Sequence, residues 1–138
     1  MKALQTSAAL AAKRILIGKP GLDGHDIGAK IIALTLRNAG AEVIYTGLRR
    51  SPQQIAQVAV DEGVDAVGLS ILSGSHKELV AEVIAQLREF KAHGIKVFVG
   101  GTIPAEDQPY LRDLGVAAIF TADMSLDAVV NSLAKSLE

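Results

Sequence analysis

Residues that could carry out chemistry gather in one short segment, residues 19–30, with the sequence KPGLDGHDIGAK. Its imidazole, His25, is a good transition-metal ligand when neutral. Such a ligand usually needs a carboxylate on its other ring nitrogen, and Asp23 stands two residues before it. Lys19, four residues before Asp23, could hold that carboxylate in turn. The spacing therefore favours a metal ligand at His25.

The same segment has an ordinary structural interpretation. Asp23 or Asp26 could cap the following helix, and the glycines could form turns. Gly28, however, falls in the first turn of the expected helix, where glycine costs about 1 kcal/mol relative to alanine. A bare backbone there would let a ligand pack closely. Because one histidine holds a free ion weakly, His25 alone suits a metal that is already held by its own macrocycle.

Other ligand classes lack their motifs. The segment contains neither G-x-G-x-x-G nor a P-loop, and residues 19–28 include no Ser or Thr for a hydroxyl-rich phosphate loop. The chain has no cysteine, which excludes disulfides, thiol nucleophiles and zinc–thiolate sites. Ser70 stands where a receiver domain would need a phosphorylatable aspartate.

The elements that must position this segment follow from hydrophobic spacing. Short apolar runs at 14–18, 42–46, 65–70, 96–100 and 117–121 are typical of strands buried on both faces. Segments with helical periodicity lie between them, and 103–115 predicts a shorter helix. The alternation predicts an α/β fold: a five-stranded parallel sheet, flavodoxin-like in order 2-1-3-4-5, with helices on both faces.

Capping residues mark the ends of several helices. Ser51, followed by Pro52 and Gln54, predicts a capping box at a helix start, and Ser75 with Glu78 predicts another. Glycines that end helices are expected at Gly40, Gly63, Gly94 and Gly115.

Three unusual loops should meet at one edge of this sheet. Residues 19–30 follow the first strand, 70–74 (SILSG) follow the third, and 100–104 (GGTIP) follow the fourth. Ligands of such sheets bind beyond the carboxyl ends of the strands, near the point where strand order reverses. We therefore expect one site to be built from these loops.

Composition narrows the partners. The 138 residues suit one domain, which we place at 14–138 after a lead-in at 1–13. A net charge of -1 does not indicate the excess of basic residues that binding to nucleic acid or to a membrane surface usually requires. No apolar run approaches the roughly 20 residues of a membrane span, and we expect a cytoplasmic protein.

The loop motifs resemble a known family. Residues 23–28 match the D-x-H-x-x-G motif of cobalamin-binding domains, residues 70–72 match its S-x-L, and residues 100–101 match its G-G. The resemblance covers about residues 14–137. It is closest to the cobalamin-binding domain or small subunit of adenosylcobalamin-dependent acyl-CoA mutases of the methylmalonyl-CoA mutase type.

The resemblance implies roles for individual residues. His25 would be the lower axial ligand of cobalt, Asp23 its partner and Lys19 the partner of Asp23. The cofactor's nucleotide tail would enter a slot between the sheet and the first helix, where Ser70 would hydrogen-bond the buried base. The full set of implied cofactor-binding residues is Lys19, Asp23, Gly24, His25, Asp26, Ile27, Gly28, Ser70, Leu72, Gly100, Gly101, Thr102, Phe120 and Thr121. One departure is the turn after the fifth strand, where FTADMS (120–125) replaces the family's Pro-Gly turn.

The resemblance also implies a partner. With no helical bundle before the domain, we expect the upper face of the cofactor to be covered by a separate large catalytic subunit whose barrel binds the acyl-CoA. The isolated chain should then bind adenosylcobalamin without mutase activity. A corrinoid carrier for methyl transfer and a non-enzymatic cobalamin-binding protein remain alternatives. The substrate, whether methylmalonyl-, ethylmalonyl-, isobutyryl- or 2-hydroxyisobutyryl-CoA, is left open.

Overall fold

The structure, a computed structural model, describes residues 10–18, 27–46, 51–71, 76–92, 94–101, 103–121 and 124–137. Five parallel strands form one sheet in the order β2-β1-β3-β4-β5, which confirms the predicted flavodoxin-like topology. The strands are β1 (Arg14–Gly18), β2 (Glu42–Tyr45), β3 (Ala66–Ile71), β4 (Lys96–Gly101) and β5 (Val116–Phe120).

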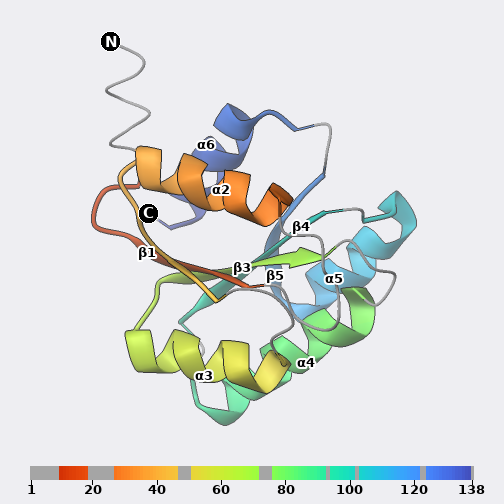
Figure 1. Ribbon diagram of the computed structural model, residues 1–138. Helices are drawn as coiled ribbons and strands as arrows, with labels where there is room; N and C mark the ends of the chain where they lie inside the picture. Colours follow the sequence, from red (N-terminus) through yellow and green to blue (C-terminus); the bar gives the residue numbers. More distant parts are fainter. Residues whose placement is uncertain are drawn as a thin grey trace.

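Helices cover both faces of the sheet (Figure 1). Helices α2 (Ile27–Asn38) and α6 (Leu126–Ser136) lie over one face. Helices α3 (Pro52–Glu62), α4 (His76–Glu89) and α5 (Gln108–Leu114) lie over the other, and a short 3-10 turn, η1 (Ala105–Asp107), leads into α5. Each helix follows a strand in the chain and begins at the carboxyl edge of the sheet.

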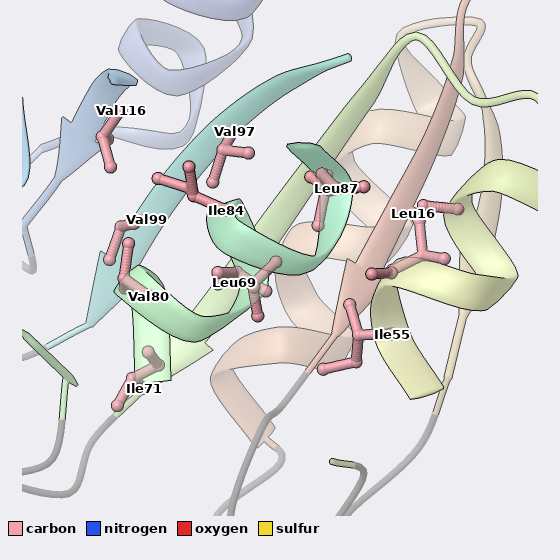
Figure 2. Packing of buried hydrophobic residues seen from close by; sticks show 14 of the residues in the cluster. Leu16, Ile55, Leu69, Ile71, Val80, Ile84, Leu87, Val97, Val99 and Val116 are labelled. Carbon is pink, nitrogen blue, oxygen red and sulfur yellow. The ribbon is translucent and has the colours of Figure 1, made fainter. Parts of the chain in front are cut away.

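The face under α3 and α4 is closely packed. Leu16, Leu69 and Val99 from the sheet meet Ile55 and Val80 from the helices, and all five are fully buried (Figure 2). Burying an aliphatic side chain of this size contributes about 1.5–3 kcal/mol. This layer anchors the central strands against α3 and α4.

Burial of the strands differs between centre and edge. β1 and β4 are largely buried, as the apolar runs predict. The expectation of burial on both faces is wrong for β2, whose residues are exposed or half-buried, and for β5, where Ala117 is exposed. β2 and β5 are the two edge strands, and each has a neighbouring strand on one side only. Solvent therefore reaches side chains that an apolar run by itself suggests are buried.

The capping residues behave largely as predicted. Ser51 accepts a hydrogen bond from the Gln54 backbone amide, and the Gln54 side chain accepts one from the Ser51 amide. Gly63 and Gly115 end their helices in the left-handed conformation. At the end of α4 the left-handed residue is Lys91, with φ of 59°, while Ser75 lies outside the described residues.

Part of the expected lead-in packs against the domain. Leu10 is fully buried in the layer under α2, and its backbone amide donates to the Ala39 carbonyl at 2.9 Å. In the part of the chain that the structure describes, no helix has the length and apolar character needed to cross a membrane.

Candidate functional site

Small residues form a trough on the sheet face beneath α2 and α6. Gly68 and Ser70 on β3 point to this face, and Gly100 on β4 lies beside Ser70 in the strand register. Because side chains alternate across a strand, these three residues share one face, and none of them carries a large side chain. The Ile17 side chain reaches over Gly68, where a Cβ would lie 2.9 Å from its Cδ1. We call the three residues, Gly68, Ser70 and Gly100, the sheet trough.

Bulky side chains bound the sheet trough. Ile17 on β1 pairs with Gly68, and Phe120 on β5 pairs with Gly100, so each stands at one side. Phe98 on β4 stacks against Phe120, with ring centroids 5.9 Å apart and ring planes 8° from parallel. The aromatic pair gives the trough a flat apolar wall.

Two helices roof the trough and leave a space. Ala29, Ile32 and Leu36 of α2 and Val129 and Leu133 of α6 face the sheet across a cavity of about 310 Å³. We call this cavity the slot. Ligand pockets run from about 300 to 1,000 Å³, whereas a 150 Å³ apolar cavity holds one benzene. The slot therefore has room for a two-ring heterocycle.

Glycine occupies the last two positions of β4, Gly100 and Gly101, for different structural reasons. Gly101 has φ of +130°, and a Cβ there would lie 2.1 Å from the Ile71 carbonyl oxygen, so only glycine fits. A Cβ at Gly100 would meet only Phe120, its carbonyl oxygen at 3.5 Å and its Cβ at 3.8 Å, which are ordinary contacts. The protein's own packing therefore does not require glycine at position 100. What its missing side chain provides is open space in the slot.

The mouth of the slot lies at the carboxyl edge of the sheet. Ser70 and Thr121, both half-buried, stand there near the ends of β3 and β5. Ile31 and Leu126 line the opening between α2 and α6 and are 48% and 42% exposed. The mouth is thus polar on the sheet side and apolar on the helix side.

A polar contact joins two elements at the same edge, on the other side of the sheet. Lys77, at the start of α4, places its Nζ 3.6 Å from Asp107 Oδ1 in η1. The same Nζ lies 5.9 Å from the centroid of the Tyr110 ring in α5. This contact ties the segment after β3 to the segment after β4.

The structure brings part of the predicted site together. Ile27 and Gly28 are the first two residues of α2, which confirms a glycine in the first helical turn. The predicted residues that line the slot are Ser70, Gly100, Gly101, Phe120 and Thr121. The predicted residues that lie outside the described parts of the chain are Lys19, Asp23, Gly24, His25, Asp26, Leu72 and Thr102.

Sequence reasoning missed much of the slot's wall. Gly68 lies in the middle of a strand, and a strand glycine is a recognised sign of close approach by a ligand or backbone. That signal was available in the run DAVGLS. Phe98, Leu36 and Leu133 carry no comparable signal, because apolar residues in a strand or helix interior read as ordinary core.

Comparison with known proteins identifies the family. The model of the B12 binding domain matches residues 13–130. Ethylmalonyl-CoA mutase of Methylorubrum extorquens is 47% identical over 126 residues, which is 91% of this chain and 18% of that protein. The 2-hydroxyisobutanoyl-CoA mutase small subunit of Aquincola tertiaricarbonis is 40% identical over 120 residues, which is 87% of this chain and 88% of that subunit.

A solved structure supports the fold. The cobalamin-binding protein from Desulfitobacterium hafniense superposes with a TM-score of 0.77 at 21% identity, covering 90% of this chain and 58% of that one. At this identity the likeness concerns the fold alone. The family match, together with a slot that opens at the carboxyl edge of the sheet, shows that the chain belongs to the B12-binding domain family.

Proposed function

We propose that this chain is the cobalamin-binding subunit of an adenosylcobalamin-dependent acyl-CoA mutase and works with a separate, larger subunit that binds the acyl-CoA. The main observation behind this proposal is the slot, an apolar cavity of about 310 Å³ that opens at the carboxyl edge of the sheet in a B12-binding domain. Gly100 keeps it open because it has no side chain. The alignment with a small subunit of a mutase, over 88% of that subunit, supports the division between two chains.

The residues present fit the nucleotide tail of cobalamin. The tail ends in an apolar two-ring base, which suits the hydrocarbon walls between the sheet trough and the two helices. Ser70 is the side chain that would hydrogen-bond the base, and Thr121 at the mouth suits the polar ribose and phosphate that precede it. The first residues of α2, Ile27 and Gly28, follow directly on the segment that holds His25.

Roles for the remaining residues come from the family motif. His25 would coordinate the cobalt of the cofactor, with Asp23 as the carboxylate that orients its ring and Lys19 beside that carboxylate. When bound, adenosylcobalamin supplies the radical chemistry of a carbon-skeleton rearrangement, which belongs to the cofactor. This chain would contribute placement: the slot would hold the tail, and His25 would coordinate the cobalt.

The choice between a mutase and a methyl-transfer carrier rests on similarity. The monomethylamine corrinoid protein of Methanosarcina barkeri shares the fold at a TM-score of 0.75 but is 18% identical. The mutases reach 40–47% identity over most of this chain. Substrate choice among the acyl-CoA thioesters lies with the larger subunit.

Two experiments test this proposal. The purified chain should take up hydroxocobalamin and adenosylcobalamin with the spectrum of a cofactor whose own base has left cobalt. Co-purification with candidate large mutase subunits should then give turnover of at least one thioester among the methylmalonyl, ethylmalonyl, isobutyryl and 2-hydroxyisobutyryl forms, with none from either chain alone. A chain that binds no cobalamin, or one that pairs only with a methyltransferase, would refute the proposal.

A further inference from the structure

A second surface lies at the carboxyl edge of the sheet, on the side of α4 and α5 and away from the slot. It consists of Lys77 in α4, Pro104 and Asp107 at the two ends of η1, and Pro109 and Tyr110 in α5. We call it the Tyr110 corner. Helices α4 and α5 pack side by side (Figure 1), and the ion pair between Lys77 and Asp107 joins α4 to η1 at this edge.

Two charged residues of the Tyr110 corner depart from the local preferences of helices. Lys77 places a cation in the first turn of α4, where the helix dipole disfavours positive charge. Asp107 stands at the capping position of α5, yet its side chain makes no capping hydrogen bond. Instead Lys77 Nζ lies 3.6 Å from Asp107 Oδ1 and 5.9 Å from the centroid of the Tyr110 ring. Such departures are expected where residues serve a function.

The Tyr110 corner presents an aromatic ring that is already held in place. Tyr110 is 45% exposed, and the Lys77 ammonium over its ring restrains it. Pro104 and Pro109 are exposed as well, and each fixes the backbone dihedral φ. A surface that is ordered beforehand loses little conformational entropy on binding, and tyrosine is enriched among the residues that dominate binding energy.

The charges around the Tyr110 corner favour a different protein over a second copy of this chain. Glu78 and Glu106 are both exposed, and each is the sequence neighbour of a charged residue of the corner. Together with Lys77 and Asp107 they give three carboxylates against one ammonium. Two copies meeting through this surface would bring like charges together, whereas a partner with basic residues around a pocket for the ring would be complementary.

The position of the Tyr110 corner indicates which protein this is. The slot opens at the carboxyl edge, so a subunit that encloses a cofactor held there must approach along the edge where the corner also lies. We propose that the Tyr110 corner is a docking surface for the larger mutase subunit, with the Tyr110 ring as its anchor. This inference rests on the proposed function, which supplies that subunit.

The test measures the affinity of the cobalamin-loaded chain for the large subunit identified by co-purification. Tyr110→Ala should weaken this association about 10- to 100-fold, whereas Tyr110→Phe, which keeps the ring, should stay within about twofold of wild type. Lys77→Met, which keeps the aliphatic stem and removes the charge, should weaken it about fivefold. Phe90→Ala is the matched control, because Phe90 is an aromatic residue with 36% exposure that lies just beyond the other end of α4. Its loss should leave the affinity unchanged.

Two further measurements separate docking from folding and from cofactor binding. The isolated Tyr110→Ala chain should unfold at nearly the wild-type temperature, because the ring is exposed. It should also bind cobalamin as tightly as wild type, because Tyr110 does not line the slot. Association of the wild-type chain with the large subunit should weaken as ionic strength rises, since salt screens the complementary charges.

The outcomes distinguish this inference from the proposed function. A Tyr110→Ala chain that binds the large subunit as tightly as wild type would overturn the docking surface and leave the proposed function intact. Equal losses in Tyr110→Ala and Phe90→Ala would do the same, as would a fall in the cobalamin affinity of the isolated Tyr110→Ala chain. Self-association of the chain that Tyr110→Ala abolishes would overturn the choice of partner. If no large subunit binds the wild-type chain, the proposed function fails and the docking surface fails with it.

Discussion

Replacing Gly100 by alanine should weaken cobalamin binding while leaving the protein as stable as before or slightly more so. A Cβ at this position meets Phe120 only at ordinary contact distances, and the backbone there is not in the left-handed region. The new methyl group instead projects into the slot beside Ser70. One substitution therefore changes folding and binding in opposite directions.

The two magnitudes follow from this geometry. Gly→Ala at a compatible position stabilises a fold by about 0.4–1 kcal/mol through the unfolded chain. In a domain of this size that raises Tm by a few degrees at most. An extra carbon in a well-packed site costs typically about 1–3 kcal/mol, which corresponds to a loss of affinity of about 5- to 150-fold.

Thermal unfolding without ligand, followed by titration with cobalamin and with cobinamide, checks both directions. Cobinamide is the matched ligand because it lacks the tail, so its affinity should be the same for wild type and Gly100→Ala. If the folded variant binds cobalamin as tightly as wild type, the tail does not pass over the sheet trough and the assignment of the slot is wrong.

Three further substitutions test separate parts of the molecule. His25→Ala should remove protein nitrogen coupling from the electron paramagnetic resonance spectrum of the bound cob(II)alamin form, and unchanged coupling would refute that axial ligand. Gly101→Ala should destabilise the fold by about 2–4 kcal/mol in denaturant titration, because its Cβ would collide with the Ile71 carbonyl oxygen at 2.1 Å; a cost below 1 kcal/mol would contradict the close approach. Ser51→Ala should cost about 1 kcal/mol through loss of its hydrogen bond with the Gln54 amide, with cobalamin affinity unchanged, since this cap lies on the opposite face from the slot.

Topology was predictable because its signals are local and repeated. Each strand is a short apolar run, each helix has a stripe of 3.6 periodicity, and caps such as Ser51 mark where a helix begins. Because strands and helices alternate along the chain, the strands are expected to form a parallel sheet. The exposure of β2 was missed because burial was inferred from its apolar run alone, although the predicted strand order already places β2 at an edge of the sheet.

Residues of the site were predictable where they match the family motif, as Ser70 and Phe120 do, or where they break a local rule. Gly28 in a first helical turn and Gly100 at a strand end are unfavourable for local structure, and such residues point to a ligand. Phe98 and Leu133 break no rule: they are apolar residues in apolar positions. Their part in the slot arises because the packing of α2 and α6 leaves room above them, and sequence spacing carries no measure of unfilled volume.

The two layers of this domain are unequal, and that has a thermodynamic consequence. Between the central strands and α3 and α4 the buried side chains pack closely, with a pocket at the edge between β2 and α3, whereas α2 and α6 cover the slot. In native-state hydrogen exchange, amides of α2 and α6 should open at lower free energy than those of β3 or α4. A tail lodged in the slot would complete the unfinished half of the core, so protection of α2 and α6 should grow with cofactor concentration as linkage requires. The cofactor's tail would then fill, in this layer, space that the protein's own side chains leave empty.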